Sequence, residues 1–281
     1  MVDLVVIGHV TLDEVAGATR PGGAAYYAAV TASRLGLEVG LLTSFGPEYS
    51  LDALPSGLEV VGVPSERTTI YRVDESRQGR TLTLRARAAD IEEGHLPEAW
   101  REVPLVILCP VANEVDPGLA AVFDQASVGV LPQGWMRARG KGGVVAPQRW
   151  EDADLVLPHA HSVVVSEEDV EPFEKDALDW FQRVPVGVVT RGSRGATLFV
   201  NGEPYHVEPD TAAEVDTTGA GDVFATTLLI EYEREGNHWD AAAAAACAAA
   251  MSVEAPGAAG TPDRAALDAR LRAYRRRQTG G

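Results

Sequence analysis

Short apolar runs that end in a glycine, a proline or a polar residue recur along the chain. The first run, residues 4–7, is continuously apolar and is followed by Gly8. Such a run is typical of a strand buried on both faces of a parallel sheet. The same pattern predicts strands at residues 38–45, 58–63, 104–109, 127–131, 162–165, 186–190 and 196–200.

Helical patterns lie between these runs. They cover residues 24–35, which stop at Gly36, a segment from Asp222 to about residue 233, and the alanine-rich residues 237–253. Strands that alternate with helices imply right-handed crossovers and a mainly parallel sheet. We therefore expect an α/β fold with three layers, in which helices cover both faces of the central sheet.

A different pattern occupies residues 67–87. Two segments, 68–73 and 80–87, alternate between apolar and polar residues around a turn at residues 75–79, which predicts a β-hairpin. Its mixed faces suit a small lid over a polar site, although a surface hairpin with no role in binding is the alternative. A length of 281 residues fits one domain, residues 1–281, with this hairpin as its appendage.

Composition narrows the possible partners. The formal net charge of -17 argues against nucleic acid and anionic membranes, which such a surface would repel. It does not exclude ATP, because a local site of backbone donors and a metal can hold phosphates. Two cysteines in apolar runs indicate no disulfide framework, and the sequence predicts neither a signal peptide nor a membrane span. A cytoplasmic location is expected.

The clearest chemical signal is residues 216–222, with the sequence Asp-Thr-Thr-Gly-Ala-Gly-Asp, directly before an apolar helical run. Glycines and alanine at a helix start leave backbone N–H groups uncovered at the positive end of the helix dipole, which makes an anion pocket. A carboxylate beside such a pocket would repel a bound phosphate. It makes chemical sense if Asp222 removes a proton from a hydroxyl while the amides stabilise a phosphoryl group in transfer.

This stretch closely resembles the signature of the ribokinase-like carbohydrate kinases, the PfkB family, whose members phosphorylate a hydroxyl of a sugar, polyol or nucleoside with ATP. The resemblance implies that Asp222 is the catalytic base. It also implies that the backbone of Gly219, Ala220 and Gly221 forms the anion hole.

The resemblance extends to the N-terminal part of the chain. Asp13 follows the first strand and Gly22-Gly23 opens the first helix, which implies that these three residues bind the acceptor. Two departures accompany the match. Ala24 and Tyr27 stand where typical ribokinases have a lysine and an asparagine, so we expect a different acceptor-binding set that includes Tyr27. Only eight residues separate Asp13 from Gly22, so we expect a smaller lid than the one in ribokinase.

Polar residues after other strands are further candidates. Asn113 and Gln133 each follow a predicted strand end, where ligands bind in open α/β sheets, but exposure in a loop is equally compatible. His159 and His161 lack a third ligand at suitable spacing, which argues against a metal pair.

The segment Ser166-Glu167-Glu168-Asp169 stands where the family usually has an Asn-x-x-Glu motif that organises magnesium. The resemblance therefore implies a Mg²⁺ role for Ser166, Glu167 and Asp169, and carboxylates are suitable ligands for that ion. The alternative is an acidic first helical turn that complements the helix dipole.

The resemblance also implies an ATP side of the site. The candidate nucleotide-binding residues are Thr190, Gly192, Gly195, Thr218, Gly257 and Ala258. Relatives often use K⁺ beside the segment that corresponds to residues 216–218, so a monovalent cation is a further candidate here.

Together these features predict an ATP-dependent kinase that acts on a small sugar or polyol, with an inositol-like acceptor favoured because tyrosines narrow the pocket. One alternative is a nucleoside kinase of the same family, in which Tyr26 or Tyr27 would stack on the base. Another is a sensor that binds a sugar or nucleotide without turnover. We expect a monomer or a homodimer.

Overall fold

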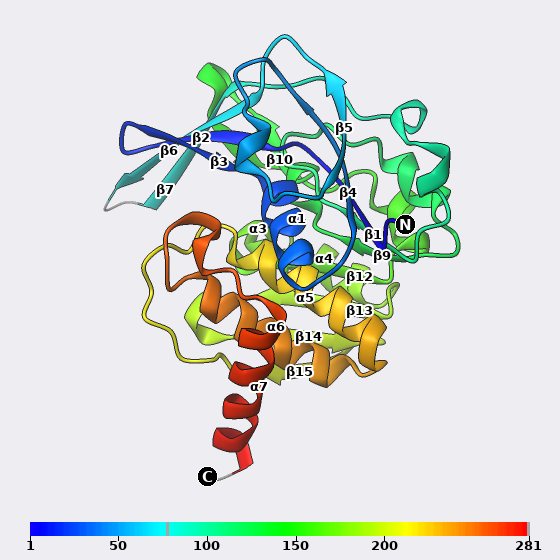
Figure 1. Ribbon diagram of the computed structural model, residues 1–281, viewed down its shortest axis with the longest axis vertical. Coiled ribbons are helices and arrows are strands. Elements are labelled where there is room, and N and C mark those ends of the chain that lie inside the picture. Colours follow the sequence, from blue (N-terminus) through cyan, green and yellow to red (C-terminus); the bar gives the residue numbers. More distant parts are fainter. Residues whose placement is uncertain (77–78, 280–281) are drawn as a thin grey trace.

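The computed structural model describes residues 1–76 and 79–279. Within this part of the chain, a nine-stranded sheet forms the centre of the molecule (Figure 1). From one edge to the other its strands are β15 (Glu203–Val207), β14 (Ala196–Val200), β13 (Val186–Thr190), β12 (Ser162–Ser166), β9 (Ser127–Val130), β8 (Leu105–Leu108), β1 (Leu4–Ile7), β4 (Val39–Phe45) and β5 (Glu59–Pro64).

The sheet is parallel except at one edge. β1 pairs in parallel with both β4 and β8, whereas β14 and β15 run antiparallel to their neighbours. Every residue of β1 and β8 is buried, because both faces of these central strands are covered. The apolar runs therefore predicted the strands of the parallel part correctly.

One face of the sheet is covered by the longer helices. These are α1 (Ala24–Arg34), α5 (Ala220–Glu235), α6 (His238–Ser252) and α7 (Arg264–Thr279). Three alanines of α6, Ala241, Ala245 and Ala248, have no exposed surface, and such small side chains let α6 pack closely against α5. The end of α7 projects from the body of the molecule (Figure 1).

The opposite face is covered by the short helices α2 (Ala153–Val156), α3 (Glu167–Val170) and α4 (Glu174–Phe181), with several 3₁₀ turns. Tryptophans fill this layer: the Trp135 ring stacks on Trp150 at 5.6 Å, and Trp150 meets Trp180 edge-on at 5.2 Å. The expected three-layer α/β/α architecture is therefore confirmed. No helix in residues 1–76 and 79–279 is long and apolar enough to span a membrane.

A second sheet forms the lid beside the carboxyl ends of the central strands (Figure 1). Its strands, in spatial order, are β3 (Ala18–Gly22), β2 (Thr11–Val15), β6 (Thr69–Ser76) and β7 (Gly79–Ala86). The hairpin expected at residues 67–87 is confirmed as β6 and β7, although residues 77–78 in its predicted turn lie outside the described residues.

The Asp13 to Gly22 spacing, from which we expected a smaller lid, accommodates two further strands of this sheet. Asp13 does not precede the lid strands but lies on β2, which pairs antiparallel with β3. Ala16 and Gly17, at φ values of 49° and 83°, connect the two strands in a turn of only two residues. A tight turn of this kind fits a hairpin into a spacing that looked too short for it.

A further hairpin, β10 (Arg137–Arg139) and β11 (Val145–Pro147), was not expected from the sequence. Residue Val144, just before β11, forms an isolated antiparallel bridge with Thr83 of β7. The hairpin thus lies against the lid and carries residues of the 137–147 segment toward the carboxyl ends of the central strands.

Candidate active site

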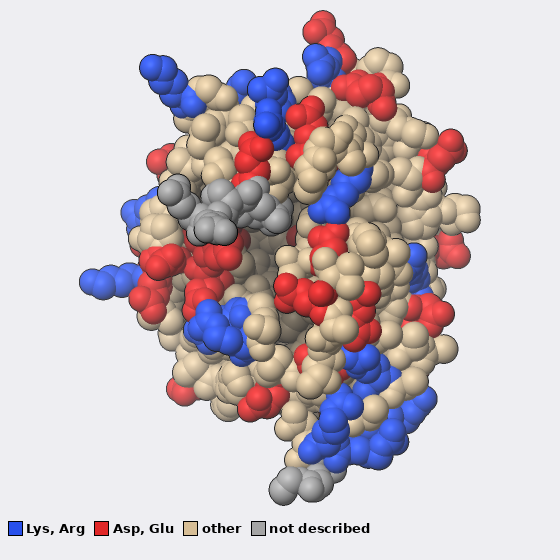
Figure 2. Space-filling view, turned by 90° about the vertical axis from the view of Figure 1, so that its left-hand side faces the viewer, with Lys and Arg blue, Asp and Glu red and all other residues tan. Residues whose placement is uncertain are grey.

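Two adjoining cavities lie between the lid, the β10–β11 hairpin and the start of α5. The larger has a volume of about 510 Å³ and the smaller about 120 Å³. On the side of the molecule shown in Figure 2 the surface is hollowed at mid-height, and Asp and Glu side chains gather along the hollow. Five residues line both cavities: Leu82, Gln133, Arg137, Gly219 and Asp222. These residues mark the junction between the cavities.

The start of α5 is shaped by Gly219. Its φ of 81° lies in the left-handed region, and a Cβ at this position would lie 2.3 Å from the ring of Tyr27. Glycine is therefore required by both the backbone conformation and the close approach of the ring. Gly219 and Gly221 line the larger cavity, so the first turn of α5, with its outward-directed N–H groups, opens onto it, and Ala220 lies between them.

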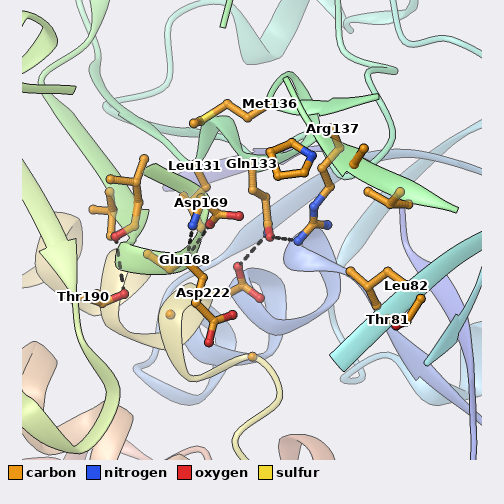
Figure 3. Close-up of a pocket in the computed structure, with 18 of the residues that line it drawn as sticks. Thr81, Leu82, Leu131, Gln133, Met136, Arg137, Glu168, Asp169, Thr190 and Asp222 are labelled. Atoms are coloured by element: carbon orange, nitrogen blue, oxygen red, sulfur yellow. Dashed lines mark hydrogen bonds between the residues drawn. The ribbon is translucent and has the colours of Figure 1, made fainter. Parts of the chain in front are cut away.

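Asp222 lies in the first turn of α5 and faces both cavities (Figure 3). Burial raises the pKa of this carboxyl to about 7; Arg137 opposes the shift, and Asp169 and Asp13 add to it. The side-chain nitrogen of Gln133 donates a hydrogen bond to Oδ1 of Asp222 at 3.4 Å. A carboxylate with this pKa can accept a proton near neutral pH.

Arg137 is a residue of the site that sequence reasoning missed. Its Nη2 donates to Oε1 of Gln133 at 2.8 Å, which links it through Gln133 to Asp222 (Figure 3). It is the one lysine or arginine among the described residues that line the two cavities. The sequence offered a weak signal, since Arg137 follows Gln133 by four residues in the segment after a strand end.

The smaller cavity contains most of the predicted acceptor residues. Asp13, Gly23, Tyr27 and Gln133 line it. Asp13 is 8% exposed, and its Oδ1 accepts a hydrogen bond from the hydroxyl of Thr11 at 2.8 Å. Gly22 lies behind the carboxylate, where a Cβ would come within 2.2 Å of Asp13 Oδ2.

Two other candidates lie elsewhere. Tyr26 and Asn113 line neither cavity. The carbonyl oxygen of Asn113 instead accepts a hydrogen bond from Arg87 at 2.7 Å. For Asn113, the alternative of a loop position apart from the site is therefore the better description.

Asp216 joins three segments. Its Oδ2 accepts from Arg20 Nη1 at 2.5 Å and from the amide of Gly257 at 2.9 Å, and its Oδ1 accepts from the amide of Thr218 at 3.0 Å. Burial raises the pKa of Asp216, but these amides, the Thr218 hydroxyl and Arg20 outweigh it and lower the pKa to about 2. The carboxylate beside which K⁺ was a candidate is thus already paired with a guanidinium, so these residues do not fit a monovalent cation.

The acidic segment after β12 is divided between two roles. Ser166, Glu168 and Asp169 line the larger cavity, and Ser166 caps α3 by accepting from the Asp169 amide at 3.1 Å. Glu167 points elsewhere and forms ion pairs with Arg191 and Arg194. No cluster of three His, Cys, Asp or Glu suited to a metal occurs among the described residues. The carboxylates of Glu168 and Asp169 nevertheless fit Mg²⁺, because this ion binds through few protein ligands together with water and phosphate.

The predicted nucleotide residues are spread around the site. Thr190, at the end of β13, lines the larger cavity, whereas Thr218 lines the smaller one and accepts a hydrogen bond from Arg20 at 3.0 Å. The remaining four line neither cavity; they lie in the turn between β13 and β14 and in a 3₁₀ turn after α6: Gly192, Gly195, Gly257 and Ala258.

The chain is similar to kinases of several kinds. It is 26% identical over 255 residues to the cytidine kinase of Thermococcus kodakarensis, covering 83% of this chain and 90% of that protein. It is 28% identical over 242 residues to a fructokinase of Escherichia coli, covering 74% of this chain and 76% of that one. A solved structure of a pyrophosphate-dependent kinase in the ribokinase family, complexed with a pyrophosphate analog and myo-inositol, has the same fold, with a TM-score of 0.78, 23% identity and coverage of 95% and 99%.

The family model described as the pfkB family carbohydrate kinase matches residues 8–264. The match includes the lid, both cavities and the start of α5, which are the parts of the molecule described above. The chain therefore belongs to the pfkB family of carbohydrate kinases.

Proposed function

We propose that this kinase transfers the γ-phosphoryl group of ATP to a hydroxyl of a small sugar or polyol, with Asp222 as the general base. The observation that carries the proposal is the position of Asp222 at the junction of a large and a small cavity, beside the Gly219 turn. ATP would enter the larger cavity and the acceptor the smaller one.

The acceptor side supplies orientation. Asp13 and Gly23 offer a carboxylate and a backbone edge to acceptor hydroxyls, which directs one hydroxyl toward Asp222. Asp222 takes the proton of that hydroxyl while the oxygen of the acceptor hydroxyl forms a bond to the γ-phosphorus. The bond between the γ-phosphorus and the bridging oxygen breaks, and ADP leaves with the electron pair.

The donor side supplies charge stabilisation. Gly219 and Gly221, at the start of α5, line the cavity where the γ-phosphoryl group would lie, and their amides would stabilise its charge, whereas the Ala220 amide donates to the Thr217 carbonyl at 3.3 Å. Glu168 and Asp169 are the residues that would hold Mg²⁺, mostly through water, with Ser166 fixing the Asp169 carboxylate through a hydrogen bond of 2.6 Å. A bound divalent cation would neutralise charge on the phosphates.

The size of the acceptor cavity favours a small polyol. Its volume of about 120 Å³ is below the roughly 300–1,000 Å³ typical of pockets for drug-sized ligands. Tyr27 and Tyr71 form part of its wall, and both rings are nearly fully buried and so leave little room to widen it. An inositol-like ring is the acceptor we favour, and myo-inositol is bound in one structure of the same fold.

A nucleoside acceptor is the second candidate. The similarity to a cytidine kinase over 83% of this chain favours it, and the aromatic wall of the small cavity could stack on a base. Opening of the lid would be needed to admit a whole nucleoside into a cavity of this size.

The test is ADP release with Mg-ATP across inositols, pentoses, hexoses and nucleosides, with the phosphorylated product identified by NMR. We expect turnover with one or a few polyols or sugars. Turnover with nucleosides alone would replace the polyol proposal with its alternative. Nucleotide binding without turnover on any acceptor would favour the sensor interpretation.

A further inference from the structure

We propose that Arg137 binds the phosphoryl group while it is being transferred, on the side of the group opposite the amides of α5. This inference rests on the proposed function, because it takes the two cavities as donor and acceptor sites. It adds to that function a catalytic side chain carried by the β10–β11 hairpin.

The first support is the place of Arg137. A phosphoryl group that passes from the larger to the smaller cavity must cross their junction, and Arg137 is among the five residues that line both. In Figure 3 Arg137 descends from the β10 side, and its guanidinium ends near Gln133 and above Asp222. A residue that bound only the donor or only the acceptor would need to line only one of the two cavities.

The second support is charge. The other charged side chains that line the cavities are all acidic: Asp13, Glu168, Asp169 and Asp222. Among the side chains that the structure describes, which leave out those of residues 75–80, none forms an ion pair with Arg137 within 4.0 Å. A cation among acidic groups, without a carboxylate partner in contact, is suited to an anion that arrives from outside.

The third support is the way in which Arg137 is held. Gln133 accepts from its Nη2 and donates to Asp222, so one amide side chain fixes the guanidinium relative to the base. Arg137 and Tyr71 both line the acceptor cavity; burial raises the pKa of the Tyr71 hydroxyl to about 12, and the nearby guanidinium opposes this rise. These contacts use a small part of the five N–H donors of a guanidinium.

Such an arrangement acts on the transition state. During transfer, negative charge spreads over three equatorial oxygens of the phosphoryl group, and donors on both sides stabilise it. The amides of α5 supply one side, and Arg137 would supply the other. An interaction made mainly in the transition state raises kcat and has little effect on the KM of either substrate.

The test compares Arg137→Met and Arg137→Lys with Arg139→Met, an exposed residue of the same strand that lines neither cavity. We expect Arg137→Met to lower kcat by about 10²–10³-fold, as for loss of one oxyanion donor. The KM values for ATP and acceptor should change by less than about threefold, as expected for an interaction made mainly in the transition state. The kcat of Arg137→Lys should lie between those of Arg137→Met and the wild type, and the kcat of Arg139→Met should match the wild type.

Two kinetic outcomes would overturn the proposal. A raised acceptor KM with unchanged kcat would make Arg137 a ground-state acceptor ligand. A pH profile of kcat that shifts to higher pH, with the same plateau at high pH, would mean that Arg137 acts only through the charge of Asp222.

A binding measurement tests the same point without turnover. Aluminium fluoride mimics the phosphoryl group in flight, so wild-type protein should bind Mg-ADP more tightly when it is present. Arg137→Met should lose that gain and Arg139→Met should keep it; equal gains in both variants would refute the role of Arg137. Failure of the proposed function would look different, because the wild-type protein would then release no ADP with any acceptor.

Discussion

Replacement of Gly219 with alanine should damage both the stability and the activity of the enzyme. Gly219 has a φ of 81°, and its missing Cβ leaves room for the ring of Tyr27, which is 2% exposed. An alanine would place its Cβ 2.3 Å from a ring carbon, where ordinary contacts begin near 3.4 Å. The ring or the turn must therefore move by about 1 Å, the difference between these two distances.

The two costs have known sizes. A non-glycine residue in the left-handed region costs about 1–2 kcal/mol, and overpacking of a buried site costs about 1–3 kcal/mol. The free energy of unfolding should therefore fall by about 2–5 kcal/mol, which lowers the Tm by roughly 5–15 °C. A shift of the turn by about 1 Å would misplace the anion hole, and kcat should fall by about 10²-fold.

Thermal unfolding and steady-state kinetics measure both effects. Gly221→Ala is the control for stability, since it lies in the same helical turn, has no atom within 4 Å of the position that the new methyl group would occupy, and should leave the Tm unchanged or slightly raised. A Gly219→Ala protein with the Tm and kcat of the wild type would refute the reasoning, because it would mean that the turn tolerates a side chain.

Three further predictions concern charged residues. Because Asp222 is active as a base only when deprotonated and its pKa is about 7, kcat should rise about tenfold per pH unit below that value and level off above it; a flat profile from pH 5 to 8 under chemistry-limited conditions would contradict this. Arg20→Met should lower kcat by freeing the Asp216 carboxylate, and guanidinium in the buffer should restore part of the loss; no response to guanidinium would count against the link. Glu114 is 1% exposed and accepts three backbone amides, so Glu114→Gln should lower the free energy of unfolding in urea by about 2–4 kcal/mol; a loss below about 0.5 kcal/mol, typical of surface sites, would show that the carboxylate is dispensable.

Much of the fold could be predicted from the sequence because burial imposes a simple pattern. The parallel strands are buried on both faces, so they appear as apolar runs such as Leu4–Ile7. The strands β2 and β3 are partly exposed and polar, and their turn contains Ala16 at a positive φ, a conformation that is unusual for alanine. Neither feature leaves a local signal, which is why the hairpin of β2 and β3 was missed.

The residues of the candidate site likewise differ in how far the sequence alone could predict them. Gly219 and Asp222 lie three residues apart at one helix start, so local chemistry was enough to pick them out. Arg20 and Asp216 are 196 residues apart and meet only because the lid folds over the start of α5. Arg137 likewise depends on a hairpin that positions it over Asp222. Contacts of this kind are set by tertiary packing and cannot be derived from the spacing of residues in one sequence.

The most direct test of the central claim compares turnover and binding in Asp222→Asn, with the exposed Asp124→Asn as a matched control. ADP release with the preferred acceptor gives kcat, and calorimetry gives the affinities for Mg-ATP and acceptor. A general base acts mainly in the transition state, so we expect kcat to fall by about 10²–10⁴-fold with affinities nearly unchanged. Retention of kcat within a few-fold, or loss of binding in place of turnover, would contradict the assignment of Asp222 as the base.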